Sequence, residues 1–204
     1  TGNPIRNDII QNKVSREKAV AHFGFNPLLK TILVLGGSLG ARTVNKSVVR
    51  SLNTVTQQNI QLIWQTGKSF YHEAKEIASG YKNIRIFEFI SEMDYAFSCA
   101  DIILSRAGAS TISELCVIGK PAILIPLPNV VEDHQTKNAL ALADKNAALY
   151  IPDVEAEDKL MDMAIELINN QEKKEMLSKN ISDMAIRNSA ELIVDEVLKL
   201  VGSK

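Results

Sequence analysis

The residue types best suited to chemistry gather in residues 101–114, where one arginine and one glutamate flank a run of small residues. The pattern predicts a short buried strand (102–104), a turn (105–109) and a helix that begins near Ser110 or Thr111. Unpaired backbone N–H groups at such a helix start, backed by the positive end of the helix dipole, form an anion site. Arg106 adds a fork that matches phosphate oxygens, and Glu114 can accept hydrogen bonds from a diol. Phosphate beside a sugar indicates a nucleotide.

The same residues also fit a purely structural pattern. Thr111-x-x-Glu114 matches a capping box, in which the threonine accepts a hydrogen bond from the N3 amide and the glutamate reaches back to the cap amide. These residues alone do not decide between a helix cap and an anion site.

A second candidate phosphate loop is the glycine-rich turn at residues 36–41, which follows a predicted strand (31–35) and leads into a helix reaching about residue 56. The dinucleotide fingerprint would need a glycine where Leu35 stands, and the next strand ends without the acidic residue that binds ribose. A P-loop ending at residues 67–69 would need a glycine where Leu62 stands. The sequence therefore predicts neither a nicotinamide cofactor nor a Walker-type triphosphate site.

Evidence for catalytic groups is thin. The glycine turn formally matches a nucleophile elbow around Ser38, but no histidine and acid in a suitable order support a hydrolase. His22, His72 and His134 fall in separate elements without metal-ligand spacing, and no Asp-x-Asp pair occurs. We therefore expect no metal and no cofactor.

A polar cluster follows the predicted strand that ends at Pro126. Asp133 suits an N-cap, while His134, Gln135 and Asn138 lie where a ligand at the sheet edge would meet them. Imidazole and amide groups both donate and accept hydrogen bonds, which suits sugar hydroxyls. A solvated first helical turn explains the same residues without a ligand.

Strands alternate with helices around these residues, which predicts an α/β fold with a doubly wound parallel sheet of about six strands. Ligands bind such sheets beyond the carboxyl ends of the strands, so the loops after residues 35, 89, 104 and 126 should gather at one edge. Apolar runs predict strands at 31–35, 60–64, 84–89, 101–104, 122–126 and 148–151, with helices at 15–23, 69–79, 91–99 (capped by Ser91) and 134–146 among those between them.

The remaining chain, residues 155–204, shows helical stripes and no strand pattern, which predicts helices that close the domain. We expect a single domain over residues 1–204, preceded by a turn around residues 2–8. The chain begins at Thr1 rather than at a methionine, so a longer protein is expected.

Composition fits a soluble globular protein, with 46% hydrophobic and 23% charged residues. A formal net charge of −1 gives no general attraction to nucleic acid, so no nucleic-acid partner is expected. Cys99 and Cys116 predict buried thiols in a reducing compartment rather than a disulfide. Neither a long apolar run nor a secretory leader pattern occurs, which predicts a soluble, cytoplasmic chain.

Several motifs in one order resemble the C-terminal, donor-binding domain of the peptidoglycan N-acetylglucosaminyltransferases of glycosyltransferase family 28, which have the two-domain GT-B fold. The resemblance covers residues 1 to about 150, with the expected helices after them. The motifs are GNPIR (2–6), GGSLGARTVN (36–45), WQTG (64–67), FISEM (89–93), SRAGASTISE (105–114) and DHQTKNA (133–139).

The resemblance implies that this chain binds UDP-N-acetylglucosamine. By similarity, the nucleoside would meet the Ile90 backbone (uracil), Met93 (packing) and Glu114 (ribose). The remaining expected contacts, in order, are Gly37, Ser38, Arg106 and Arg6 at the diphosphate; Ala109, Ser110, Thr111, Ile112 and Ser113 along the diphosphate and sugar; and His134, Gln135 and Asn138 at the N-acetylglucosamine. Leu39 and His134 depart from glutamines found in the family.

The implied reaction is inverting transfer of N-acetylglucosamine to the undecaprenyl-linked acceptor lipid I, which gives lipid II at the cytoplasmic face of the bacterial membrane. In the family, the general base, the acceptor groove and the membrane contact belong to an N-terminal domain that this chain lacks, and residues 1–14 would be the linker to it. The chain is then expected to be inactive alone, with Arg106 stabilising the leaving diphosphate. The alternatives are an enzyme similar to UDP-N-acetylglucosamine 2-epimerase and a non-catalytic interaction module.

Overall fold

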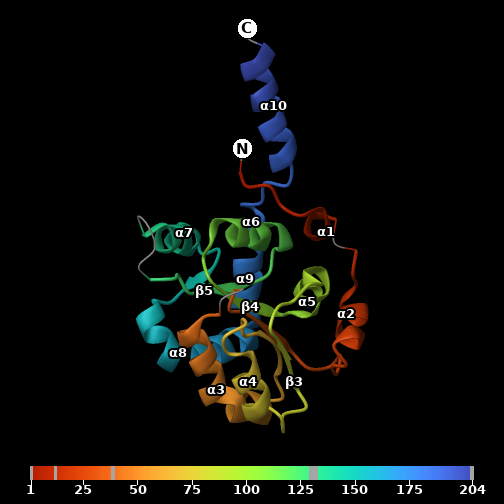
Figure 1. Ribbon diagram of the computed structural model, residues 1–204, viewed down its shortest axis with the longest axis vertical. Coiled ribbons are helices and arrows are strands. Elements are labelled where there is room, and N and C mark those ends of the chain that lie inside the picture. Colours follow the sequence, from red (N-terminus) through yellow and green to blue (C-terminus); the bar gives the residue numbers. More distant parts are fainter. Residues whose placement is uncertain (1, 12, 38–39, 129–132, 203–204) are drawn as a thin grey trace.

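Six parallel strands form the centre of the protein, in the order β3-β2-β1-β4-β5-β6 (Figure 1). The computed structural model describes residues 2–11, 13–37, 40–128 and 133–202. The doubly wound α/β fold expected from the sequence is confirmed. The strands are β1 (Thr31–Leu35), β2 (Gln61–Gln65), β3 (Ile84–Phe87), β4 (Ile102–Ser105), β5 (Ala122–Leu124) and β6 (Leu149–Tyr150).

Helices connect the strands and cover both faces of the sheet. They are α1 (Asn7–Ile10), α2 (Arg16–His22), α3 (Arg42–Gln57), α4 (Tyr71–Ile77), α5 (Met93–Cys99), α6 (Ala109–Ile118), α7 (His134–Ala143), α8 (Asp153–Asn169), α9 (Gln171–Ser182) and α10 (Ser189–Gly202).

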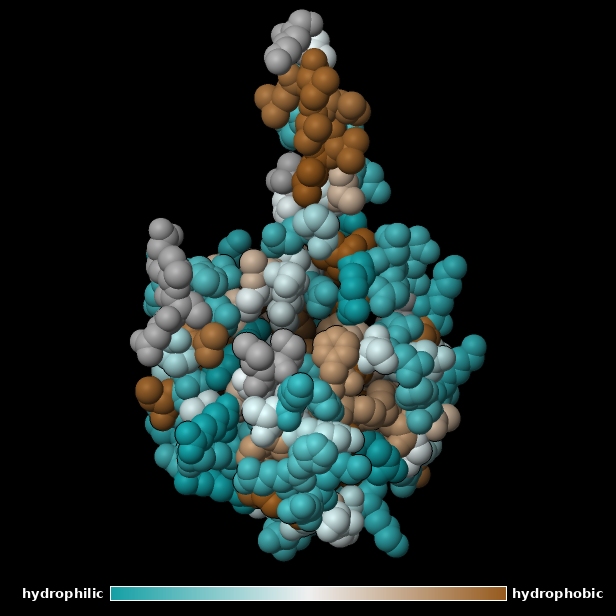
Figure 2. Space-filling view, in the orientation of Figure 1, coloured by the Kyte–Doolittle hydropathy of each residue, from teal (hydrophilic) through white to brown (hydrophobic). Residues whose placement is uncertain are grey.

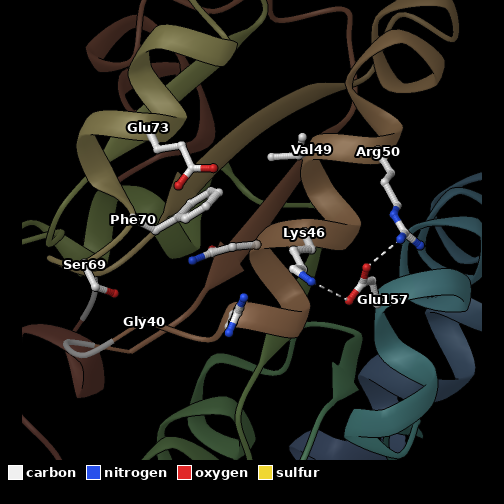
Figure 3. A pocket seen from close by; sticks show the side chains of 10 residues that line it. Gly40, Lys46, Val49, Arg50, Ser69, Phe70, Glu73 and Glu157 are labelled. Carbon is white, nitrogen blue, oxygen red and sulfur yellow. Dashed lines mark hydrogen bonds and ion pairs between the residues drawn. The ribbon is translucent and has the colours of Figure 1, made fainter.

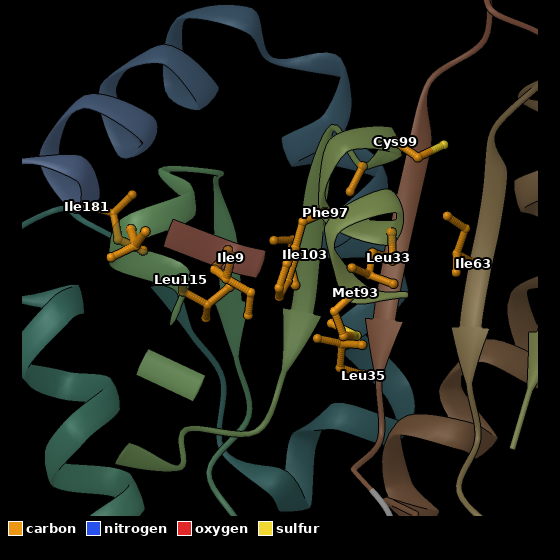
Figure 4. Packing of buried hydrophobic residues seen from close by; sticks show 14 of the residues in the cluster. Ile9, Leu33, Leu35, Ile63, Met93, Phe97, Cys99, Ile103, Leu115 and Ile181 are labelled. Atoms are coloured by element: carbon orange, nitrogen blue, oxygen red, sulfur yellow. The ribbon is translucent and has the colours of Figure 1, made fainter. Parts of the chain in front are cut away.

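The central strands bury both of their faces, which is why they read as continuous apolar runs. One face packs against α1, α2, α5, α6 and α7, and the other packs against α3, α4 and α8. Figure 4 shows the first face, where Leu33, Ile63 and Ile103 of three strands meet Phe97 of α5 and Leu115 of α6. Both cysteines are free and buried, as expected.

The structure has neither the expected cap of α5 nor the capping box that the sequence left open at α6. Helix α6 begins at Ala109 after an extended Gly108, so Thr111 lies inside the first turn and cannot form the capping box with Glu114. Helix α5 begins at Met93, and its N-cap position is Glu92 rather than Ser91. The N-cap thus lies one residue after Ser91 in α5 and three residues before Thr111 in α6.

Other expected boundaries also shift. Strands β3 and β5 end two residues earlier than expected, and the helix expected at 69–79 is confined to Tyr71–Ile77. Asp133 does hold the N-cap position of α7, but with a left-handed backbone (φ 51°), and its side chain accepts a hydrogen bond from the Thr136 hydroxyl (2.6 Å) rather than from a backbone N–H of the helix. The sequence also missed α1, whose Ile9 is buried in the core beside α6.

The three C-terminal helices differ in their packing. Helices α8 and α9 pack on the body as expected, whereas α10 projects away from it (Figure 1). The apolar side chains of α10 are therefore exposed (Figure 2), by between 52% and 76% at Val194, Val197, Leu198, Leu200 and Val201.

Candidate functional site

The loops that carry the predicted site begin side by side at the carboxyl edge of the sheet. Leu35 at the end of β1 pairs with Ser105 at the end of β4, and Ser105 pairs with Leu124 at the end of β5. This register places the glycine turn, the start of α6 and the loop before α7 along one edge, where parallel α/β sheets bind their ligands.

The start of α6 has no side-chain cap. Its N-cap residue, Gly108, provides no side-chain cap, so the first backbone N–H groups of the helix are not satisfied by that residue. The N-terminal segment lies beside this turn, because the Asn3 amide donates to the Ala109 carbonyl (3.3 Å) and to Ser113 Oγ (3.0 Å). Asn3 was not singled out from the sequence, since a contact across 106 residues leaves no local signal.

Glu114, the predicted ribose contact, and Arg6, a predicted diphosphate contact, lie close together. Arg6 Nε is 3.7 Å from Glu114 Oε1 and 3.9 Å from Asp8 Oδ1. Burial raises the pKa of Glu114 above its ordinary value, while the positive charge of Arg6 acts in the opposite direction. Glu114 is thus a partly buried carboxylate at the sheet edge, held beside a cation.

Arg106 lies over the ends of β5 and β6. Its Nη1 donates to Asp153 Oδ1 (2.5 Å) and to the carbonyls of Ile125 and Pro126 (both 3.2 Å). The sequence did not single out Asp153, and the only local signal was its place at a helix start after the last strand. The expected contact of Arg106 with a diphosphate stays a prediction.

The predicted nucleobase contacts, Ile90 and Met93, lie in the loop after β3 and at the start of α5. Both are buried, and the Ile90 N–H donates to the side-chain oxygen of Gln65 at 3.0 Å. Gln65 is itself buried at the end of β2, so it fixes the orientation of this peptide group. Sequence reasoning noted at this strand end only that the acidic residue of the dinucleotide fingerprint is missing, and it assigned no role to Gln65.

Two of the residues in α7 that are predicted to contact the sugar form hydrogen bonds with neighbouring loops. Gln135 accepts a hydrogen bond from the Leu127 N–H (2.9 Å), and Asn138 donates to the Ala107 carbonyl (3.0 Å). His134, the first residue of α7, is exposed. All three residues lie at the sheet edge, and their contacts with a sugar stay predictions.

The glycine turn adopts backbone angles that favour glycine. Gly37 and Gly40 have φ values of 75° and 87°, in the left-handed region. A Cβ atom on Gly40 would lie 2.7 Å from the Thr66 carbonyl oxygen, whereas one on Gly37 would meet nothing within 4 Å. Ser38 and Leu39, which the sequence places in this turn, lie outside the described residues.

We predict that alanine substitutions in this turn distinguish the cost of backbone strain at a positive φ from the cost of a steric clash by the added Cβ. Gly40→Ala should lower the free energy of unfolding by about 3 kcal/mol, since it adds a clash with backbone to the strain of a left-handed angle. Gly37→Ala, which adds strain alone, should cost about 1 kcal/mol. Gly80→Ala is the control, with open space and no positive φ. Urea denaturation measures all three, and equal losses at Gly37 and Gly40 would contradict the argument.

A cavity of about 640 Å³ lies on the other side of the glycine turn, between α3, α4 and α8 (Figure 3). Lys46 and Arg50 of α3 line it and both pair with Glu157 of α8, at 3.3 Å and 2.6 Å. Ile90 and Glu114 are not among its lining residues. The cavity is therefore separate from the predicted nucleoside site.

Within the described ranges, no group of three or more histidine, cysteine or acidic side chains is placed to hold a metal ion. No helix in the same ranges is both long enough and apolar enough to cross a membrane.

Comparison with known proteins settles the family. The model of the glycosyltransferase family 28 C-terminal domain matches residues 31–196, which include every strand of the sheet. The chain belongs to glycosyltransferase family 28. The resemblance drawn from the six motifs is thereby confirmed.

Individual relatives of this family 28 chain agree with that assignment. It is 48% identical, over its whole length, to the UDP-N-acetylglucosamine--N-acetylmuramyl-(pentapeptide) pyrophosphoryl-undecaprenol N-acetylglucosamine transferase of Parabacteroides distasonis, and covers 56% of that protein. The crystal structure of MurG from Acinetobacter baumannii matches with a TM-score of 0.78 and 28% identity, over 94% of this chain and 55% of that one. The family 28 chain thus spans about half the length of these relatives.

A more distant likeness concerns the fold alone. A crystal structure of UDP-N-acetylglucosamine 2-epimerase matches with a TM-score of 0.61 but 15% identity, over 98% of this chain and 48% of that one. The family 28 domain and the epimerase therefore share an architecture, which by itself carries no function from one to the other.

Proposed function

We propose that this chain is the donor-binding domain of an N-acetylglucosaminyltransferase and that it binds UDP-N-acetylglucosamine. The observation that carries the proposal is the placement of Glu114 in the second turn of α6, a helix that begins without a side-chain cap at the sheet edge that also carries the glycine turn. An anion site at a helix start, with a carboxylate in the next turn, suits a diphosphate joined to ribose. The 48% identical relative is named as an N-acetylglucosamine transferase, which supports the identity of the sugar.

Within this site each expected residue has a role. The Ile90 backbone and Met93 hold the uracil, and Glu114 accepts hydrogen bonds from the ribose hydroxyls. The diphosphate lies against the glycine turn and the first residues of α6, with Arg106 and Arg6 as the nearby cations. His134, Gln135 and Asn138 face the N-acetylglucosamine.

The chemistry of the leaving group follows from this arrangement. When the bond between the sugar and the diphosphate breaks, negative charge develops on the departing UDP. Backbone N–H groups already oriented at the start of α6, together with Arg106, stabilise that charge without needing to reorganise. This chain then supplies donor binding and stabilisation of the leaving group.

The whole protein, on this proposal, transfers N-acetylglucosamine to lipid I and forms lipid II for peptidoglycan synthesis at the cytoplasmic face of the membrane. The acceptor groove, the general base and the membrane contact belong to an N-terminal domain that residues 1–14 join to this one. The chain alone therefore binds the donor but does not turn it over.

Calorimetry on the isolated chain tests the proposal. UDP-N-acetylglucosamine should bind at least ten times more tightly than ATP, and neither hydrolysis nor transfer should follow. Equal affinity for both nucleotides would overturn donor binding. Conversion of UDP-N-acetylglucosamine into another UDP-hexosamine would instead indicate an epimerase, and the absence of any nucleotide binding would favour an interaction module.

A further inference from the structure

One carboxylate joins the two loops that make up the predicted diphosphate site. Asp153 Oδ1 accepts a hydrogen bond from Arg106 Nη1 at 2.5 Å and another from Thr43 Oγ1 at 2.6 Å. Thr43 lies in the first turn of α3, directly after the glycine turn, and Arg106 lies in the loop that leads to α6. Asp153 therefore fixes the position of both segments from a third element, α8.

The surroundings make this connection stronger than a surface ion pair. The Arg106 and Asp153 side chains are 15% and 12% exposed, so water screens their attraction weakly. Asp153 is the first residue of α8, where the helix dipole favours a negative charge. Arg106 Nη1 also donates to the carbonyls of Ile125 and Pro126, which locks the plane of the guanidinium.

The hydrogen bonds of the Arg106 guanidinium indicate which of its N–H groups could bind a ligand. Among the described residues, every hydrogen bond to its guanidinium uses Nη1. Nε and Nη2 keep their donors for another acceptor, and the opposite edge of a locked guanidinium fork suits an anionic oxygen.

We propose that Asp153 is a positioning residue for donor binding: it holds Arg106 and the start of α3 in the arrangement that receives the diphosphate. The proposal rests on the donor-binding function proposed above. It adds a residue that acts through Arg106 and Thr43 without touching the ligand.

A purely structural ion pair would make a different prediction, because loss of stability affects all ligands alike. If Asp153 positions Arg106, its loss should affect binding of the second phosphate more than binding of the nucleoside. The useful probes are therefore UDP and UMP, which differ by one phosphate. Asp158, on the same helix and paired with the exposed Arg50, provides a matched control for the substitution.

The experiment measures UDP and UMP affinity by calorimetry for the unmodified chain and for Asp153→Asn, which keeps the shape of the side chain. We expect Asp153→Asn to weaken UDP binding about tenfold and UMP binding less than threefold, and Asp158→Asn to change neither. In an Arg106→Ala background, Asp153→Asn should weaken UDP binding by no more than the roughly threefold loss that acts through Thr43. Thr43→Val, a milder change that leaves the ion pair intact, should weaken UDP binding about threefold.

Each outcome is decisive. Equal losses for UDP and UMP, an undiminished effect in the Arg106→Ala background, or unchanged UDP binding in Asp153→Asn would overturn the positioning role. If the unmodified chain binds neither nucleotide, the proposed donor-binding function itself fails, and the positioning role fails with it. Melting curves recorded in parallel confirm that each variant is folded.

Discussion

Replacement of Glu114 by alanine is expected to weaken binding of UDP-N-acetylglucosamine about 100-fold. Each hydrogen bond from a ribose hydroxyl to a carboxylate contributes about 1.5–3 kcal/mol net of the exchange with water. A net loss of about 2.7 kcal/mol corresponds to that factor of 100. Calorimetry on the isolated chain measures it directly.

Two controls isolate the ribose contact. Glu114→Gln should bind with intermediate affinity, since its amide still accepts one hydrogen bond, and Glu175→Ala on the remote helix α9 should bind normally. The unmodified chain should bind the 2′-deoxy analogue of UDP more weakly than UDP itself. Glu114→Ala should bind the two nucleotides equally. If the variant still discriminates against the deoxy analogue, Glu114 does not hold the ribose.

The pH dependence follows from the same carboxylate. Burial raises the pKa of Glu114 above its ordinary value of 4.5, so a fall in pH towards that raised pKa protonates the acceptor and weakens UDP binding. The free energy of unfolding changes with pH in the opposite direction to UDP binding, because the folded protein binds this proton more tightly than the unfolded chain does. Glu114 therefore lowers the free energy of unfolding as pH rises from 4.5 through the raised pKa. Glu114→Gln should remove both dependences.

Replacement of Trp64 by alanine is expected to lower the free energy of unfolding by about 4 kcal/mol, the usual cost of emptying a large buried aromatic site. Trp64 has no exposed surface in β2 and packs in the core beneath α3 and α4. Its indole N–H also donates to Asn45 Oδ1 at 3.0 Å, and Asn45 in turn donates to the Thr66 carbonyl beside the glycine turn. Urea denaturation measures the loss.

A second substitution separates packing from hydrogen bonding at this position. Trp64→Phe keeps most of the volume but leaves Asn45 Oδ1 without its donor, which should cost about 1–3 kcal/mol. Leu28→Ala, at a side chain that is 89% exposed, should change the free energy of unfolding by less than about 0.5 kcal/mol. A loss below about 2 kcal/mol for Trp64→Ala would show that the core closes over the missing ring.

Much of the fold could be predicted because its signals are local. A strand buried on both faces must be apolar throughout, so residues 31–35 identified β1 without any tertiary information. Helix starts were harder where a good capping side chain lay near a small flexible residue. At α6, Gly108 adopted the cap conformation and Thr111 became an ordinary first-turn residue.

The candidate site was predictable only in part, because some of its residues act through contacts between distant parts of the chain. The glycine turn and the Arg106 to Glu114 segment carry local motifs, so the sequence located both loops. Asp153 and Gln65 act through contacts with residues 47 and 25 positions away in the chain, and no local pattern predicts such contacts. The motifs therefore located the loops but did not reveal the residues that hold them.

The strand order also constrains how the chain acquires its structure. Strands β1, β2 and β3 pair in sequence order, each joined to the next through one helix, but β1 gains its second neighbour only when β4 (Ile102–Ser105) is present. During synthesis the edge of β1 is thus an unpaired row of backbone groups until residue 105 has left the ribosome. We expect pulse-labelled hydrogen exchange during refolding to protect β2 before β4, so that the carboxyl ends of β1, β4 and β5, on which the donor site depends, come together late.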